Sequence, residues 1–125
     1  MLIQNILSYD DFNNYMEKYK CIIVNISAIW CKPCNVIKPD IEKFISVIDE
    51  VDMIYLKLDE SIYSEDDRFQ TFFEMSKIPY FAFIKESIII DKFVSGDFNI
   101  VSKRLFTNIS REKNSFQDFK LDNDF

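Results

Sequence analysis

Trp30-Cys31-Lys32-Pro33-Cys34 is the stretch around which the rest of the chain is organised. It follows an apolar run, residues 21–26, that predicts a buried strand. It opens a segment, residues 35–48, whose apolar side chains recur at helical spacing. The two cysteines are therefore expected at the start of a helix, just beyond the carboxyl end of a strand.

A helix N-terminus is a favourable place for thiol chemistry. Its unpaired backbone N–H groups and partial positive charge favour a thiolate over a thiol at Cys31. Cys34 lies one turn later on the same helical face, so the two residues can form a disulfide without a movement of the backbone. Pro33 is tolerated between them because its missing N–H would have no partner in the first helical turn.

A Cys-x-x-Cys pair also occurs in zinc sites, but this chain lacks the other ligands. A structural zinc site usually needs four Cys or His ligands, and the sequence has three cysteines and no histidine. We therefore expect no metal, because the site would need carboxylates or a second chain to be complete. The lack of histidine also excludes Ser–His and Cys–His nucleophile pairs, so catalysis has to come from the thiols. Cys21 is interpreted as a buried, inert residue.

Val24 to Cys34, together with Lys77-Ile78-Pro79-Tyr80-Phe81, resembles the active-site segment and the cis-proline segment of the thioredoxin family. Three further residues fall where that family usually has a helix-kinking proline, a lysine near the active site and a glycine after the last strand: Pro39, Lys57 and Gly96. The resemblance covers most of the chain. It implies an α/β domain with a thioredoxin-like fold, in which a central mixed β-sheet is flanked by helices on both faces.

The resemblance also implies a thiol–disulfide oxidoreductase that reduces protein disulfides. In such a mechanism the Cys31 thiolate attacks a substrate disulfide, and Cys34 then attacks Cys31 to release the reduced substrate. The redox-active disulfide Cys31–Cys34 serves in place of a separate cofactor. Thioredoxin reductase or another donor is the expected source of electrons, and the protein is expected to be a monomer.

Substrate contacts are expected around the predicted cis-proline. A cis bond before Pro79 would present the backbone of Ile78 beside the thiols, where an extended substrate can form strand-like hydrogen bonds. Trp30 and Tyr80 are expected to supply the apolar contact surface around Cys31, with ordinary packing as the alternative role of their rings.

Two residues depart from the family pattern near the thiols. Thioredoxins usually carry a buried aspartate six residues before the first cysteine, as proton acceptor for the second; here Asn25 stands there, and its amide cannot accept a proton at neutral pH. Lys32 replaces the usual glycine and adds a positive charge beside Cys31. Lys57, which usually faces the aspartate, is expected to lack a partner and to favour the thiolate. Asn25, Lys32, Pro33 and Lys57 are therefore expected to modulate the pair, and the two departures, Asn25 and Lys32, are expected to make it more oxidising.

The composition limits the class of protein and its partners. With 125 residues, of which 48% are hydrophobic, the chain can form one domain with a single core. A formal charge of -6 argues against nucleic acid as a partner, and no apolar stretch is long enough for a bilayer. Residues 1–6 lack the features of a signal peptide, and three cysteines fit a reducing compartment. A cytoplasmic location is expected, or a virion if the source is a virus.

The pattern along the chain predicts the order β-α-β-α-β-α-β-β-α. Ser8 and Asp97 are expected to cap the first and last helices. Further strands are expected at residues 2–6, 53–58, 81–84 and 87–94, and one acidic helix between 59 and 76. The turn at Lys85-Glu86 lacks the usual glycine, so its type is left open. The inner sides of the second and last helices are expected to carry Val36, Ile37, Ile41, Phe44, Ile45 and Ile48, and Ile100, Val101, Leu105, Phe106 and Ile109.

A thioredoxin-like domain is expected over residues 1–110, followed by an acidic C-terminal tail, residues 111–125. This tail is expected either to be mobile or to dock its apolar residues on the domain or on a partner: Phe116, Phe119, Leu121 and Phe125.

Two alternative functions stay open. A glutaredoxin-like or disulfide-forming oxidoreductase would share the fold and the thiols, although the lack of a secretory signal counts against an oxidase. A redox-silent, thioredoxin-like binding module would share the fold alone, and the intact cysteine pair counts against it.

Overall fold

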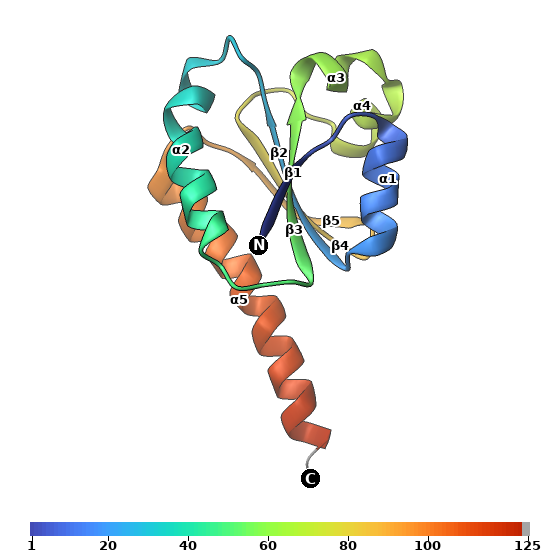
Figure 1. The fold of residues 1–125 in the computed structure, drawn as a ribbon, viewed down its shortest axis with the longest axis vertical. Helices are drawn as coiled ribbons and strands as arrows, with labels where there is room; N and C mark the ends of the chain where they lie inside the picture. The colour runs from blue at the N-terminus through green and yellow to red at the C-terminus, as the bar shows by residue number, and fades with distance from the viewer. Residues whose placement is uncertain (124–125) are drawn as a thin grey trace.

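The computed structural model describes the backbone of residues 1–123 and the side chains of residues 1–113. A five-stranded sheet lies between two layers of helices (Figure 1), which confirms the predicted central mixed sheet with helices on both faces. The elements in chain order are β1 (Leu2–Asn5), α1 (Tyr9–Lys18), β2 (Cys21–Ser27), α2 (Lys32–Ser46), β3 (Met53–Asp59), α3 (Glu60–Glu65), α4 (Asp67–Phe73), β4 (Tyr80–Lys85), β5 (Ile88–Val94) and α5 (Phe98–Asn123).

The strand order of the sheet is β1-β3-β2-β4-β5. The pairs β1–β3 and β2–β3 are parallel, whereas β2–β4 and β4–β5 are antiparallel. β2 is the central strand, which explains why its sequence is apolar on both faces. The carboxyl end of β2 therefore leads into the cysteine motif from the middle of the sheet.

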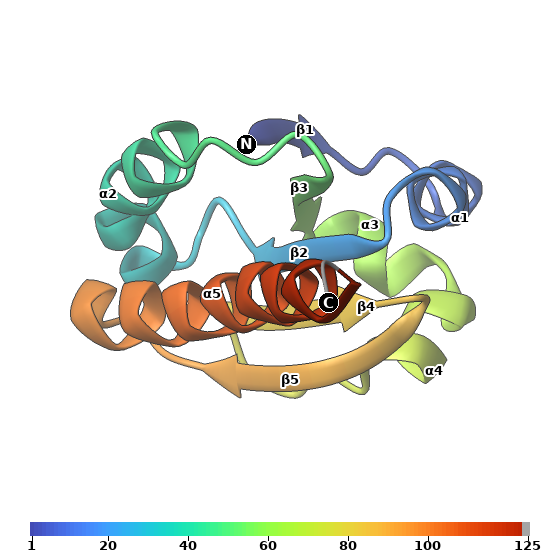
Figure 2. The same cartoon turned by 90° about the horizontal axis from the view of Figure 1, so that it is seen from below.

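Each face of the sheet carries its own core, because side chains alternate along a strand. Even-numbered residues of β2 and β3 face α1, α3 and α4, whose buried side chains are aromatic: Phe12, Tyr63, Phe69 and Phe73. Odd-numbered residues face α2 and α5, whose buried contributions to this core, among the described side chains, are aliphatic: Ile37, Ile41, Ile45, Val101, Leu105 and Ile109. Figure 2 shows the two helical layers on opposite sides of the strands.

The N-terminus of α1 is capped as predicted. Ser8 Oγ accepts a hydrogen bond from the backbone N–H of Asp11 at 3.1 Å, and the Asp11 carboxylate accepts one from the N–H of Leu7 at 2.9 Å. These two bonds satisfy amide groups that a helix start leaves unpaired.

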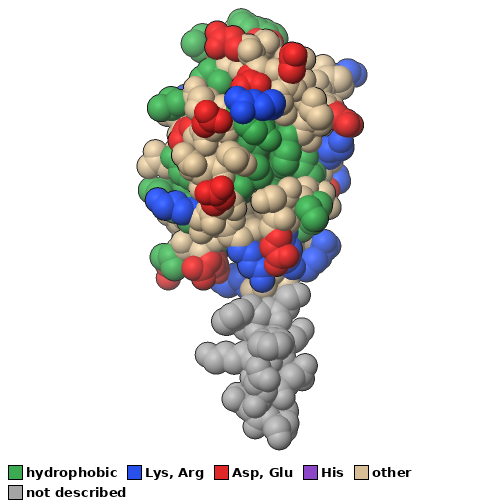
Figure 3. Space-filling model, turned by 90° about the vertical axis from the view of Figure 1, so that its right-hand side faces the viewer, with side chains coloured by type: hydrophobic (Ala, Val, Ile, Leu, Met, Phe, Trp, Pro, Cys, Tyr) green, Lys and Arg blue, Asp and Glu red, His purple; other side chains and the backbone are tan. Residues whose placement is uncertain are grey.

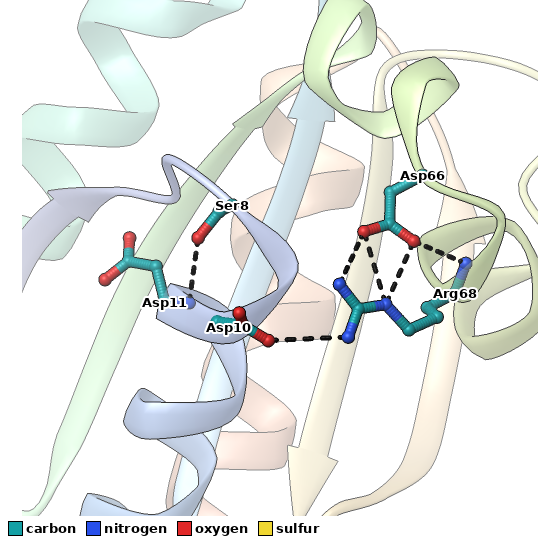
Figure 4. A network of polar contacts seen from close by, with 5 residues as sticks. All are labelled: Ser8, Asp10, Asp11, Asp66 and Arg68. Carbon is teal, nitrogen blue, oxygen red and sulfur yellow. Dashed lines mark hydrogen bonds and ion pairs between the residues drawn. The ribbon is translucent and has the colours of Figure 1, made fainter.

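Arg68 ties this end of α1 to the junction of α3 and α4 (Figure 4). Its guanidinium pairs with Asp66 at 2.8 Å and with Asp10 at 3.4 Å, and it lies 4.6 Å from the ring centre of Tyr9. The contact joins segments that lie 58 residues apart in the sequence.

The expected acidic helix between residues 59 and 76 is in fact two short helices, α3 and α4. Asp66 interrupts the helix with an extended backbone (φ -135°, ψ 114°), and its carboxylate caps α4 by accepting from the N–H of Arg68 at 3.0 Å. A capping residue that bonds the following backbone competes with helix continuation.

Three residues assigned to inner helix faces are exposed instead: Val36, Ile100 and Phe106. Over residues 98–113 of α5, the part whose side chains are described, the buried apolar positions are Val101, Leu105 and Ile109, a row with a spacing of four residues. The buried face of α2 and of α5 is therefore narrower than the apolar stripe of its sequence, because residues on the flank of the stripe lie away from the sheet.

The β4–β5 hairpin turns through Glu86 and Ser87, whose φ angles are 51° and 66°. Two consecutive positive φ angles in a two-residue loop are the feature of a type I′ turn. Asp97 caps α5 as predicted, since its carboxylate accepts from the N–H of Asn99 at 2.8 Å.

The backbone of α5 continues beyond residue 110, where the tail was expected to begin. Glu112 pairs with Lys85 at 3.0 Å, and Lys113 pairs with Glu50 at 3.1 Å. The predicted roles of Phe116, Phe119, Leu121 and Phe125 fall outside the residues whose side chains are described.

The surface on the side of α1 and α4 carries acidic side chains scattered around a central apolar area (Figure 3). Over residues 1–123, no helix is both long enough and apolar enough to cross a membrane.

Candidate active site

The loop between β2 and α2 is held by backbone and amide hydrogen bonds. The N–H of Cys31 donates to the carbonyl of Ala28 at 3.1 Å, and the side-chain amide of Asn35 donates to the carbonyl of Ile29 at 2.8 Å. Cys31 is the N-cap of α2, and the N–H of Asn35 donates to its carbonyl at 3.1 Å. The first cysteine is thus fixed at the predicted helix N-terminus.

Cys31 and Cys34 form a disulfide, with their Cα atoms 5.3 Å apart. The backbone N–H of Cys34 donates to Cys31 Sγ at 3.3 Å. The first turn of α2 contains no acidic residue. A hydrogen bond from the backbone and the positive end of the helix dipole therefore both favour negative charge on Cys31 Sγ in the reduced protein.

The cis-proline segment lies against the cysteines, as the resemblance implies. The Ile78–Pro79 peptide bond is cis, and Ile78 packs against the buried cluster of Ala28, Cys31 and Cys34. On the other side, a Cβ atom added to Gly96 would lie 3.0 Å from Pro33 Cβ. The absence of a side chain at Gly96 therefore lets the chain after β5 approach the cysteine motif closely.

The aromatic residues expected at the contact surface differ in exposure. Trp30 is 73% exposed and the neighbouring Ile29 is 86% exposed, so both present apolar surface beside Cys31. Tyr80 is 3% exposed, and its hydroxyl donates to the carbonyl of Phe73 at 3.1 Å. The expectation that the Tyr80 ring lies at this surface is therefore wrong, because even-numbered residues of β4 point into the core under α1 and α4.

Asn25 and Lys57 are direct neighbours across the parallel pair β2–β3. The Asn25 amide donates to the carbonyl of Tyr80 at 3.2 Å. Lys57 Nζ lies 3.0 Å from Glu42 Oε1 of α2, and the two side chains are 25% and 28% exposed. The expectation that Lys57 has no partner is wrong, since a glutamate from the covering helix replaces the aspartate that position 25 lacks.

A hollow of about 180 Å³ lies beside Cys34 at this end of the sheet. Its lining includes the polar side chains of Asn25, Glu42, Lys57 and Asp59. Sequence reasoning missed Glu42, although one signal was present. Glu42 follows Cys34 by eight residues on α2, a spacing that places both on the same side of a helix.

The other cysteine lies apart from this site. Cys21 is a free, buried thiol, and burial, reinforced by the nearby Glu112 carboxylate, raises its pKa to about 11. Among the residues whose side chains are described, no group of three or more His, Cys, Asp or Glu is placed to hold a metal ion.

Comparisons with known proteins agree with this geometry. The profile of the Thioredoxin family matches residues 4–106. The chain belongs to the thioredoxin family. It is 31% identical over 99 residues to a thioredoxin from Coprinus comatus, an alignment that covers 77% of this chain and 88% of that one. Thioredoxin H2 of Arabidopsis thaliana is 27% identical over 96 residues, which cover 75% and 67% of the two chains.

Solved structures of the family share the fold. The crystal structure of Malassezia sympodialis thioredoxin matches with a TM-score of 0.70 at 28% identity, covering 86% of this chain and 93% of that one. Family membership and the Cys31–Cys34 disulfide make this protein a thiol–disulfide oxidoreductase of the thioredoxin type. Its substrates are protein disulfides.

Proposed function

We propose that Cys31 is the attacking thiol and Cys34 the resolving thiol of this protein-disulfide reductase. The observation that carries the assignment is the position of Cys31 Sγ at the N-terminus of α2, where it accepts the N–H of Cys34. The Cys31 thiolate attacks one sulfur of the substrate disulfide, and the other substrate sulfur leaves as a thiolate. Cys34 then attacks Cys31, so two electrons pass to the substrate and the Cys31–Cys34 disulfide forms.

The substrate chain is proposed to lie along Ile78 and Pro79, with its backbone paired to that of Ile78. Ile78 packs against the cysteine cluster and Pro79 lines the hollow beside Cys34. Trp30 and Ile29 supply exposed apolar surface on the other side of Cys31. Tyr80 supports this segment through its backbone carbonyl, which accepts a hydrogen bond from the Asn25 amide of β2.

No cofactor beyond the redox-active disulfide is proposed, and the electron donor is proposed to be a thioredoxin reductase or a donor of similar function. A monomer in a reducing compartment, the cytoplasm, suits a chain with a buried free thiol at Cys21. Lys32, exposed in the first turn of α2, is proposed to make the pair more oxidising by its positive charge beside Cys31.

Insulin-disulfide reduction, with dithiothreitol or thioredoxin reductase as electron source, tests the assignment. Cys31→Ser should abolish turnover, because no thiolate remains at the helix N-terminus. Cys34→Ser should accumulate a covalent mixed disulfide between Cys31 and the substrate, visible by mass spectrometry. Wild-type activity in folded Cys31→Ser would overturn the roles given to the two cysteines.

Cys21→Ala is the matched control, since it removes a thiol outside the site. Its activity should equal that of the wild type, and a large loss in a folded variant would assign a redox role to the third cysteine. Replacing thioredoxin reductase by glutathione tests the glutaredoxin-like alternative, which predicts faster turnover with glutathione.

A further inference from the structure

Cys34 has to lose a proton before it can resolve the mixed disulfide, and position 25 offers no group that can take it. Asn25 carries an amide, which is not a base at neutral pH. Its N–H₂ group is moreover engaged by the carbonyl of Tyr80 at 3.2 Å. The acceptor has to come from another element that borders the hollow beside Cys34.

We propose that Glu42 of α2 accepts the proton of Cys34 during resolution, through water in this hollow. The inference rests on the proposed roles of Cys31 and Cys34. Glu42 and Cys34 both line the hollow, whose volume of about 180 Å³ admits several water molecules. Lys57 holds the Glu42 carboxylate at 3.0 Å, and about three quarters of each side chain is buried.

The other titratable groups around the hollow are less suited to this role. They are Lys38, Tyr55, Lys57 and Asp59. Burial, reinforced by the charge of Glu42, raises the pKa of Tyr55, so its phenol stays protonated at neutral pH. The two lysine ammonium groups are donors rather than acceptors.

Asp59 is the second carboxylate at the hollow, but it serves as the N-cap of α3. Its Oδ1 accepts from the backbone N–H of Ser61 at 2.9 Å and from the Ser61 hydroxyl at 2.6 Å. These bonds draw the carboxylate toward the helix start. Glu42, in contrast, pairs with Lys57, which also lines the hollow. Glu42 is therefore the carboxylate that is held at the hollow.

The step balances as follows. The Cys34 proton passes to Glu42 through water, and the Cys34 thiolate attacks Cys31 Sγ. The Cys31–Cys34 bond forms, the bond between Cys31 and the substrate sulfur breaks, and its electron pair leaves on the substrate thiolate. Glu42 returns the proton to solvent or to that thiolate. The Lys57 ammonium stabilises negative charge as it develops at Cys34 and keeps the carboxylate in place.

A pH-jump experiment on the full chain separates the two chemical steps. Cys31 is loaded with thionitrobenzoate at acidic pH by the aromatic disulfide reagent that carries it, and the first release of chromophore reports attack by Cys31. The pH is then raised, and the second release reports resolution by Cys34. In Glu42→Gln, resolution at pH 7 should slow by roughly 100- to 10,000-fold, the typical contribution of a positioned general base, while attack changes little.

Two matched variants remove the same charge elsewhere. Asp59→Asn removes the other carboxylate of the hollow but keeps a good helix cap. Asp40→Asn removes an exposed carboxylate two residues away on α2. Both should resolve at the wild-type rate. Equal slowing in Asp59→Asn and Glu42→Gln would overturn the assignment to Glu42.

The pH profile and a rescue distinguish proton transfer from mere support of the fold. In Glu42→Gln, the rate of resolution depends on the ionisation of Cys34 alone and should rise about tenfold per pH unit. The difference in rate between this variant and the wild type should therefore narrow as pH rises. Adding Asn25→Asp to Glu42→Gln restores a carboxylate from β2 and should recover much of the rate. A distorted fold would show neither effect.

Identical resolution by wild type and Glu42→Gln at every pH, with intact attack by Cys31, would overturn this inference and leave the proposed function standing. Failure of Cys31 to release the first chromophore in the wild type would instead overturn the proposed function.

Discussion

Lys57 shows how one contact changes the electrostatics of the site. An unpaired ammonium next to Asn25 would favour the thiolate of either cysteine. In the structure Glu42 neutralises much of that charge at 3.0 Å, so the field of Lys57 at Cys31 is weaker than the sequence suggests. The cation next to Cys31 is then Lys32, which distinguishes this site from that of thioredoxins with glycine at the same position.

Asn25 also has a positive role in the fold. Its amide donates to the carbonyl of Tyr80, so it helps to hold β4 against β2 below the cis-proline. An ionised aspartate could not make this bond, because a carboxylate has no proton to donate. The rescue variant Asn25→Asp is therefore expected to be less stable than the wild type.

Asp91 is the residue from which we predict a pH dependence of stability. Hydrogen bonds from Arg104, at 2.7 and 3.0 Å, hold its pKa below its usual range, and Asn108 adds a further bond at 2.9 Å. A lowered pKa in the folded state stabilises the protein above the pKa of the unfolded state. This contribution is lost as pH falls through the lower, folded pKa.

Asp91→Asn should therefore reduce the free energy of unfolding at pH 7 by about 1 kcal/mol, a figure discounted because Arg104 is half exposed. The difference from the wild type should shrink between pH 5 and pH 2, as measured by urea unfolding. In an Arg104→Met background the same substitution should show little pH dependence. A constant difference across this range would exclude the ion pair as its cause.

At the scale of elements, the β4–β5 hairpin carries a conformational penalty. Glu86 and Ser87 adopt left-handed backbone conformations that glycine and asparagine adopt more easily. The chain contains a single glycine, at position 96, so none is available for this turn. The antiparallel pairing on both sides of the turn keeps it closed in spite of this.

Ser87→Gly is predicted to stabilise the protein by about 1 kcal/mol, because it removes the Cβ at a positive φ angle. Thermal or urea unfolding measures the effect. Ser102→Gly, the same substitution inside α5, is the control and should destabilise by about 0.5 kcal/mol. If both substitutions destabilise equally, Ser87 is not under strain.

At the scale of the whole molecule, α5 extends the contact area of the domain beyond the expected boundary. Glu112 and Lys113 reach Lys85 and Glu50, two residues near the ends of β4 and β3. Glu112 and Lys113 also line a second hollow together with Cys21, at the end of the sheet where β2 begins. The first residues of the expected tail therefore cover the edge of the core near Cys21.

Truncation tests this cover, with Cys21 as the reporter. A chain that ends after Lys113 keeps both ion pairs, whereas one that ends after Ser110 loses them and the Glu112 carboxylate that helps to raise the pKa of Cys21. Both truncated chains should still reduce insulin, because the cysteine motif is untouched. Iodoacetamide should alkylate Cys21 slowly in the chain ending at Lys113 and faster in the one ending at Ser110. Equal rates would show that these residues do not protect Cys21.

Features that depend on a local pattern could be predicted from the sequence. The strand and helix around Trp30 to Cys34 follow from hydrophobic periodicity, and the caps Ser8 and Asp97 follow from the side chains that bond a nearby amide. These interactions join residues a few positions apart, so their geometry can be inferred without the fold. The order of strands and helices, apart from the division of the acidic helix into α3 and α4, and with it the mixed sheet, followed from the same patterns and the family resemblance.

Contacts between residues far apart in the sequence could be seen only in the folded chain. Glu42 reaches Lys57 because α2 packs over the odd-numbered face of β3, and Tyr80 is buried because its place in β4 points to the other face. Val36, Ile100 and Phe106 are exposed because they lie on the flank of the apolar stripe, away from the sheet. The apolar pattern of a helix shows which side is buried but not how wide the buried side is. Polar pairs between elements depend on tertiary packing, which no short-range pattern encodes.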